Sequence, residues 1–209
     1  MSDMRQTARG QRPPAPRAAA RWQRRRLVLG AIAATLPLGR AASNAYALAR
    51  LAEPHTHAIM RHALAPGYSD PAAFDVDDCT TQRNLDDRGR EQARRTGARL
   101  REAGVQIDRV LSSRWCRCLD TARLLGLGAV VEVPALNSFF ENRADGPAQT
   151  ASLRTLLDRL PPDETLMMVT HQVNISALLG RGTTSGEVLI FRRRPGEDAV
   201  ILGGLVVPA

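Results

Sequence analysis

Short apolar runs alternate with helix-like segments along most of this chain, and two of the runs end in a histidine. Runs such as Leu166–Val169 are apolar on both faces, which is typical of strands buried inside a parallel sheet. Their alternation with helices predicts a three-layer α/β fold, with a mostly parallel central sheet and helices on both faces. We expect strands over residues 56–60, 109–112, 129–133, 165–170, 187–192 and 199–207. We expect helices over residues 85–103, 113–125, 149–160 and 174–179.

Helix caps and loops follow from local residue types. Asp86 or Asp87 is the expected cap of the first helix, and Ser112 or Ser113 that of the second, because short polar side chains accept from free helix amides. Two long irregular loops, residues 63–86 and 134–148, separate the regular elements. Loops of this length in compact domains usually serve function, so we expect substrate specificity to lie there.

The first 47 residues differ in charge from the rest of the chain. They hold nine arginines and one acidic residue, whereas residues 48–209 hold twenty arginines and twenty acidic residues. The net charge of +8 therefore belongs to this leader, and the body is neutral. Because the body has no net positive charge, we do not expect it to bind nucleic acid.

The leader has the pattern of an export signal. Arg24-Arg25-Arg26 precedes an apolar stretch that runs to Leu38, which is shorter than the roughly twenty residues that span a bilayer. The segment resembles a twin-arginine signal peptide rather than a membrane span, and Ala45-Tyr46-Ala47 suggests cleavage after Ala47. We expect a leader over residues 1–47, a single folded domain over residues 48–209, and a periplasmic or secreted protein. A basic tail on a cytoplasmic protein is the alternative.

Reactive side chains follow three of the expected strands. Arg61 and His62 end the first strand, His171 ends the strand over residues 165–170, and Arg114 and Arg117 follow the strand over residues 109–112. Carboxyl ends of parallel strands lie on one edge of the sheet, so these side chains can converge. Guanidinium groups grip phosphoryl oxygens, and neutral imidazole is a good nucleophile near pH 7. The sequence therefore predicts a pocket for a dianion.

Four motifs occur in a fixed order over roughly residues 55–207. They are Arg61-His62-Ala63, Leu85…Gly89…Gln92-Ala93, Ser112-Ser113…Arg117…Thr121-Ala122 and Val169-Thr170-His171. With them the chain resembles the histidine phosphatase superfamily, which has the phosphoglycerate-mutase-like fold. Ala63 stands where the family usually has glycine, a variant familiar from small members that resemble phosphohistidine phosphatases.

The resemblance implies roles for four residues. His62 would attack phosphorus and become transiently phosphorylated, which divides one hydrolysis into two displacements. Arg61, Arg117 and His171 would hold the non-bridging oxygens. The implied activity is hydrolysis of a phosphate ester or phosphoramidate on a small molecule or phosphoprotein, with no cofactor and no metal. A phosphoglycerate-type mutase and a catalytically weak phosphate-binding protein are the rival functions.

Further residues are candidates for the substrate site. Arg83 and Arg114 are additional phosphate ligands, Asp70 is a further site residue, and Asn84, like Gln82, either binds phosphate or caps the next helix. The proton donor departs from the family pattern, because Ser138 stands where a glutamate is expected. Glu141 is the tentative donor, ahead of Asp70 and Glu187. Without an acid, phosphoramidates and aryl phosphates become the favoured substrates, since their leaving groups need less protonation.

Three cysteines occur, at positions 79, 116 and 118. In an exported protein Cys79 can form a disulfide with either Cys116 or Cys118, and ordinary buried thiols are the alternative. The Cys-x-Cys spacing without a nearby histidine is unsuited to zinc.

Overall fold

The computed structural model describes residues 45–209, so the predicted twin-arginine motif and apolar stretch of the leader lie outside the described residues. Residues 45–49 are helical and lead into a 3₁₀ turn, η1 (Arg50–Ala52). Ala47, Leu48 and Leu51 are buried against the core of the body. Cleavage after Ala47 stays a prediction. The described residues contain no helix that is long and apolar enough to cross a membrane.

A six-stranded sheet forms the centre of the body, in the order β3-β2-β4-β1-β5-β6. The strands are β1 (Thr56–Arg61), β2 (Arg109–Ser112), β3 (Val130–Glu132), β4 (Leu166–Thr170), β5 (Glu187–Arg192) and β6 (Val200–Val206). The first four strands pair in parallel, and β5 and β6 add an antiparallel edge next to β1. The predicted mostly parallel sheet is confirmed.

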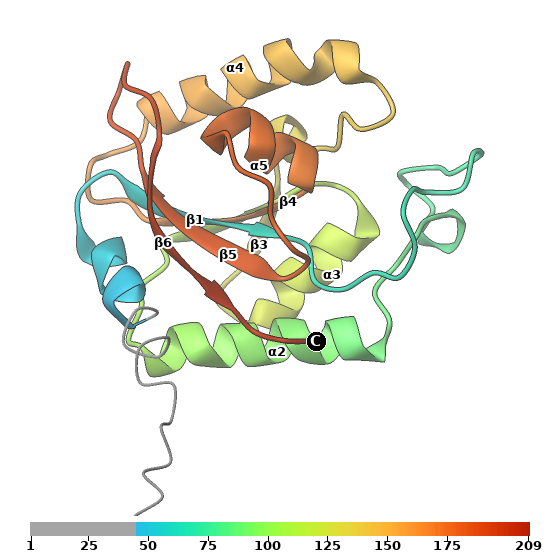
Figure 1. Cartoon of the computed structure of the whole chain (residues 1–209), viewed down its shortest axis with the longest axis horizontal. Helices are drawn as coiled ribbons and strands as arrows, with labels where there is room; N and C mark the ends of the chain where they lie inside the picture. The colour runs from blue at the N-terminus through green and yellow to red at the C-terminus, as the bar shows by residue number, and fades with distance from the viewer. Residues whose placement is uncertain (1–44) are drawn as a thin grey trace, which may run out of the picture. The chain divides into compact units, whose positions relative to one another are not determined.

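Helices cover both faces of this sheet, as predicted (Figure 1). They are α2 (Asp87–Glu102), α3 (Cys116–Leu125), α4 (Gly146–Asp158) and α5 (Gln172–Leu179). Leu100 of α2 and Leu125 of α3 share one core cluster with Met167, while Leu153 of α4 shares the opposite cluster with Met168. Successive residues of β4 point to opposite faces, which explains why a strand covered on both sides is continuously apolar.

Two helix starts differ from the prediction by three residues. Asp86 caps α2 as expected, since its carboxylate accepts from the Gly89 amide. However, α3 begins at Cys116 rather than at residue 113, and the serine cap was wrong. The Ser113 hydroxyl is hydrogen-bonded to His171 instead, at 2.9 Å, and Ser112 donates to the Ser113 carbonyl. Helix α4 starts earlier than expected, at Gly146, because Pro147 suits the first turn of a helix.

Two glycines of α2 allow close packing. A Cβ atom on Gly89 would lie 1.9 Å from the Leu64 carbonyl oxygen, and one on Gly97 would lie 1.9 Å from the Leu125 carbonyl oxygen. Any side chain at these positions would push the helix away from the chain that follows β1 or from α3. Gly89 belongs to the second sequence motif, so its role is to bring α2 against the segment after His62.

Motif side chains from α2 and α3 hold that segment by its backbone. The Ala63 amide donates to Thr121 Oγ1 at 3.0 Å, and the Leu64 amide donates to Gln92 Oε1 at 2.9 Å. Gln92 Nε2 also donates to the Val207 carbonyl at 2.7 Å, and all these contacts are largely shielded from water. A buried amide needs a partner, so these side chains fix the backbone on which His62 is mounted.

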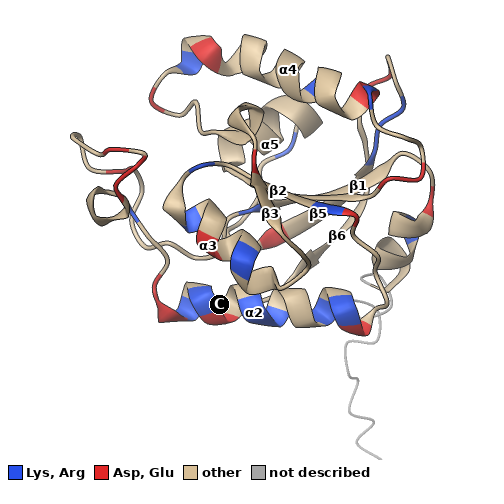
Figure 2. Cartoon of the chain, turned by 180° about the vertical axis from the view of Figure 1, so that it is seen from behind, with Lys and Arg blue, Asp and Glu red and all other residues tan. Residues whose placement is uncertain are grey.

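Charged residues of both signs lie along α2, with arginines in the majority (Figure 2). Arg94 pairs with Glu91 at 3.5 Å, and Arg99 pairs with Glu102 at 3.3 Å, all with exposed side chains. Exposed ion pairs of this kind are typical of a solvated helix face.

The long loop after β1 is attached to α3 by a disulfide. Cys79, which begins the 3₁₀ turn η2 (Cys79–Thr81), is bonded to Cys116, and Cys118 is a buried free thiol. Gln82 adds a second link, because its Oε1 accepts from the Cys116 amide at 3.0 Å while Nε2 donates to the Asp75 and Val76 carbonyls. The loop is therefore tied to the first residue of the helix that carries Arg117.

We expect the Cys79→Ser/Cys116→Ser double variant to lose roughly 2–4 kcal/mol of unfolding free energy. The bond closes a loop across a sequence separation of 37 residues, and its loss raises the entropy of the unfolded chain. Urea unfolding of oxidised wild type and the double variant measures the difference. Dithiothreitol should destabilise the wild type to the same extent and leave the double variant unchanged. An equal response of the two proteins to dithiothreitol would contradict this stabilising role.

Candidate active site

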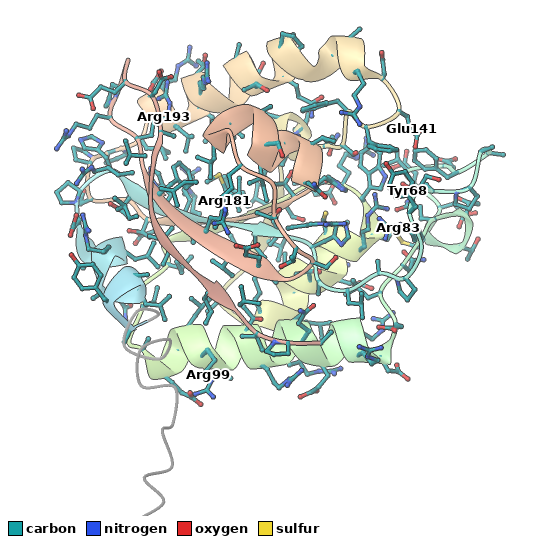
Figure 3. All side chains as sticks on the ribbon, in the orientation of Figure 1. Tyr68, Arg83, Arg99, Glu141, Arg181 and Arg193 are labelled. Carbon is teal, nitrogen blue, oxygen red and sulfur yellow. A yellow bond between two sulfur atoms is a disulfide. The ribbon has the colours of Figure 1, made fainter. Side chains whose placement is uncertain are left out.

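A cavity of about 340 Å³ opens where β1, β2 and β4 end at the same edge of the sheet. Its walls come from these strand ends, from the loop after β1 and from the loop before α4. Figure 3 places Arg83, Tyr68 and Glu141 together at this side of the molecule. Lining residues that carry polar or aromatic chemistry include Arg61, His62, Asp70, Arg83, Trp115, Arg117, Phe140, Glu141, Arg143, His171 and Gln172.

Only one ring nitrogen of His62 has a lone pair that can attack an electrophile. Its Nδ1 lies 2.8 Å from the Ala63 carbonyl oxygen, and a carbonyl only accepts, so Nδ1 carries the proton. The lone pair of the neutral ring is therefore on Nε2. The backbone contact thus selects the tautomer in which Nε2 is the nucleophilic atom.

Burial keeps His62 neutral. The ring is 2% exposed, and desolvation, followed by the positive charge of Arg117, lowers its pKa well below 6.5, although the Ala63 carbonyl opposes the shift. A protonated imidazole has no lone pair to attack with. At pH 7 the ring is in the form that a nucleophile requires.

Arg61 is held at the cavity wall by two acceptors. One terminal nitrogen, Nη1, donates to Gln172 Oε1 and to the Thr183 carbonyl, each at 3.0 Å. Within the described part of the chain Nε is buried without a partner. Burial and the charge of Arg117 lower the pKa of Arg61. The guanidinium is thus oriented by its protein contacts and retains donors for an anion.

Arg117 lines the cavity with a buried, 4% exposed side chain. Its Nη1 forms an ion pair with Asp70 Oδ1 at 2.7 Å, and Nη2 lies 3.4 Å from His171 Nδ1. A guanidinium only donates, so His171 accepts through Nδ1 and carries its own proton on Nε2. That proton is donated to Ser113 Oγ at 2.9 Å.

His171 is neutral for the same reasons as His62. Burial, then the charge of Arg117, lowers its pKa well below 6.5. The two rings lie 5.6 Å apart between centroids, and the Trp115 ring packs edge-on against His171 at 5.4 Å. The sulfur of Cys118 lies 3.4 Å from Nε2, and burial raises the pKa of this thiol to about 12. Cys118 is therefore a neutral packing group beside His171.

Arg83 reaches the cavity from the long loop. Its Nη1 donates to the Ala65 carbonyl at 2.5 Å, and burial lowers the pKa of the guanidinium to about 10, so it stays charged at neutral pH. Nε of Arg83 and of Arg117, like that of Arg61, is buried without a partner among residues 45–209. Each of these three arginines therefore has an N–H group without a hydrogen-bond partner within this range, and together they suit the binding of a multiply charged oxyanion.

The structure does not bring every candidate into the cavity. Arg114 lies outside it, where its side chain is 41% exposed and pairs with Asp77 and Glu132. Asn84 donates to the Cys79 carbonyl at 2.6 Å and does not line the cavity. Glu187 is buried in an ion pair with Arg181 and does not line the cavity.

The outer part of the cavity is aromatic and charged. Tyr68 packs edge-on against Phe140 at 5.4 Å, and the guanidinium of Arg143 lies over the same ring at 4.8 Å. Glu141 lines the cavity beside them and is exposed. Phe139 fills the core, so only the second of the paired phenylalanines forms the wall. Gln172 was missed by the sequence interpretation, although its position directly after His171 at a strand end is a usable signal.

Three buried histidines predict a loss of stability in mild acid. Desolvation lowers the pKa of His57 to about 4, and those of His62 and His171 lie well below 6.5. The unfolded state takes up protons that the folded state excludes, so stability is fully present above about pH 6.5 and falls as pH drops toward the folded pKa values. Together the three rings cost on the order of 4 kcal/mol of unfolding free energy at one pH unit below 6.5. Urea unfolding at pH 7.5 and 5.5 measures this loss of unfolding free energy. Equal stability at the two pH values would contradict the burial of these histidines in the neutral form.

Residues 58–150 match the histidine phosphatase superfamily (branch 1). The chain is 37% identical over 73 residues to the serine/threonine-protein phosphatase Pgam5, mitochondrial, of Drosophila virilis, and 43% identical over 52 residues to that of Drosophila persimilis. These matches cover 35% and 25% of this chain, and 25% and 18% of the relatives' own lengths. The chain thus spans a quarter or less of the curated relatives that it matches.

Solved structures share the fold at low sequence identity. The protein histidine phosphatase SixA complexed with tungstate superimposes with a TM-score of 0.54 and 20% identity, over 72% of this chain and 96% of that one. A mycobacterial glucosyl-3-phosphoglycerate phosphatase superimposes with a TM-score of 0.51 and 18% identity, over 70% of this chain and 96% of that one. The family match over residues 58–150 and the fold shared with these solved structures show that this chain is similar to the histidine phosphatase superfamily.

Proposed function

We propose that this protein is a phosphomonoesterase that hydrolyses a phosphate ester or phosphoramidate through a phosphohistidine on His62. The observation that carries the proposal is the environment of His62. A neutral imidazole, with its proton fixed on Nδ1 by the Ala63 carbonyl, lines a cavity that also contains the buried Arg117 and the half-buried Arg61 and Arg83.

In the first step, Nε2 of His62 attacks phosphorus while the bond from phosphorus to the leaving oxygen or nitrogen breaks. Arg61 and Arg117 hold the non-bridging oxygens, where their hydrogen bonds stabilise the charge that develops in the transition state. His171 takes up a proton as the dianion enters, because a negative charge favours the imidazolium form, and then donates through Nδ1.

In the second step, water attacks the phosphohistidine. The bond from phosphorus to Nε2 breaks, inorganic phosphate forms with the oxygen of water, and the neutral imidazole of His62 is restored. The arginines serve both displacements because the phosphoryl oxygens keep the same surroundings.

Glu141 is the proposed proton donor to the leaving group, since it lines the cavity on its outer wall. We expect Glu141→Gln to lower kcat on phenyl phosphate by about 10²-fold, and to change kcat on p-nitrophenyl phosphate by less than about threefold, because a good leaving group departs without protonation. Steady-state rates on the two substrates measure the difference. Unchanged rates on both would remove Glu141 from the mechanism and leave water as the donor.

Two other functions remain as alternatives: a phosphoglycerate-type mutase and a phosphate-binding protein that turns over poorly. Incubation of the protein with p-nitrophenyl phosphate and with a phosphohistidine peptide separates the three. Inorganic phosphate should appear at the same rate as the released product. Transfer to an added 2-hydroxy acid in place of release would indicate the mutase, and tight phosphate binding without turnover would indicate the binding protein.

The substrate is proposed to be a small molecule or a phosphoprotein. Protein substrates are supported by the names of the relatives, which are protein phosphatases.

Export to the periplasm or the outside is proposed as well, and the Cys79–Cys116 disulfide supports an oxidising compartment. The N-terminal residue of protein recovered from its native host tests export: a start after Ala47 is expected, and retention of Met1 would contradict it.

A further inference from the structure

A buried carboxylate lies beside the arginines of the cavity, and the proposed reaction does not use it. The side chain of Asp70 is 6% exposed and lines the cavity. Oδ1 accepts from Arg117 Nη1 at 2.7 Å and from the Arg83 amide at 3.0 Å, and Oδ2 accepts from the indole Nε1 of Trp115 at 3.0 Å. Both oxygens therefore have donors, and these donors come from the loop after β1, from the turn before α3 and from α3 itself.

These contacts favour the ionised carboxylate. Burial raises the pKa of Asp70, but the hydrogen bond and charge of Arg117, with the Arg83 amide and the Trp115 indole, outweigh burial and lower it overall. A proton donor must hold a proton at working pH. An Asp70 bonded in this way is poorly suited to protonate a leaving group.

The same contacts orient the guanidinium of Arg117. Asp70 holds Nη1 and His171 Nδ1 lies near Nη2, so the plane of the group is fixed by partners at both ends. A long arginine side chain without such partners would occupy several rotamers and would lose entropy on binding phosphate. The disulfide from Cys79 to Cys116 and the contacts of Gln82 keep the loop of Asp70 against α3.

We propose that Asp70 is a positioning residue that acts through Arg117, holding its guanidinium in place for the phosphoryl oxygens, and that it does not protonate the leaving group. This inference rests on the proposed function, because it assigns Arg117 to the phosphoryl group. It extends that function because it assigns to the long loop after β1 the task of orienting Arg117 through Asp70.

The test is Asp70→Asn, measured on p-nitrophenyl phosphate and on phenyl phosphate. Loss of the charged hydrogen bond should lower kcat/KM by about 10- to 100-fold, by the same factor on both substrates, and weaken competitive inhibition by tungstate in parallel. A general acid would show a far larger loss on phenyl phosphate. That result, or unchanged kinetics, would overturn the proposal.

A double-variant cycle identifies the route of the effect. If Asp70 acts through Arg117, then Asp70→Asn should have no additional effect on kcat/KM in an Arg117→Ala background. Additive losses would mean an independent role and would contradict the proposal. The matched control is Asp158→Asn, which removes a carboxylate paired with the buried Arg193 away from the cavity and should stay within about twofold of wild type.

Should Asp70→Asn fail to fold, Trp115→Phe replaces it. This variant removes only the donor to Oδ2 and keeps an aromatic ring beside His171. A fall in kcat/KM of about three- to tenfold, equal on the two esters, is expected, and a loss confined to phenyl phosphate would overturn the proposal. Wild-type turnover and phosphorylation of His62 are measured in the same series, so a failure of the proposed function is recognised separately.

Discussion

His62→Ala is expected to lower kcat/KM by at least about 10³-fold on every phosphorylated substrate. The variant removes the atom that attacks phosphorus, and the arginines alone cannot replace it. The fold should persist, because the only side-chain hydrogen bond recorded for this ring in the described structure goes to the neighbouring Ala63 carbonyl. Initial rates and a urea unfolding curve on the same preparation measure the two effects.

The control for this experiment is His55→Asn. His55 precedes β1, at the opposite end of the strand from His62, and does not line the cavity. Its φ angle is 60°, a left-handed backbone that asparagine also tolerates. Activity should remain within about twofold of wild type. If His62→Ala retained wild-type rates on both p-nitrophenyl phosphate and a phosphohistidine peptide, His62 would not be the nucleophile.

Arg117→Ala is expected to reduce both activity and stability. Its guanidinium holds phosphoryl oxygens in the proposed mechanism, so kcat/KM should fall by about 10²- to 10³-fold. The substitution also leaves the carboxylate of Asp70 buried without its cationic partner, which typically costs about 3–5 kcal/mol of unfolding free energy. Urea unfolding and steady-state kinetics measure the two losses.

A second substitution separates these two effects. In the Arg117→Ala/Asp70→Asn double variant the unpaired charge is gone, so much of the lost stability should return while activity stays low. Arg123→Ala on the same helix, with a 62% exposed side chain, should change neither quantity appreciably. Recovery of activity together with stability would show that Arg117 supports the fold rather than the reaction.

The strands of the sheet could be predicted from the sequence because each is marked by a local run of apolar residues. Continuous apolar runs such as β4 identify buried strands, and the parallel arrangement then brings His62 and His171 to the same edge, on the adjacent strands β1 and β4. The start of α3 could not be predicted in the same way. Ser113 is a good cap in isolation, but its hydroxyl is engaged by His171, a contact between residues 58 positions apart.

Loop residues were less predictable than strand ends. Arg83 and Arg114 are equal candidates in the sequence, yet the path of the chain directs only Arg83 into the cavity, while Arg114 pairs with surface acids. The choice of Cys116 over Cys118 depends on which face of α3 meets the loop, which no local pattern reveals. The contacts of Asp70 likewise depend on the folded loop, across 45 to 47 positions to Trp115 and Arg117.

The central claim is that the phosphoryl group passes through His62. Rapid quenching of the enzyme in alkali during turnover, followed by peptide mass spectrometry and ³¹P NMR, tests this claim directly, because phosphohistidine survives alkali. We expect a phosphoryl group on Nε2 of His62, absent from His62→Ala and from enzyme quenched before substrate is added. Steady turnover without any phosphorylated His62 peptide, or with the phosphoryl group on another residue, would contradict the account.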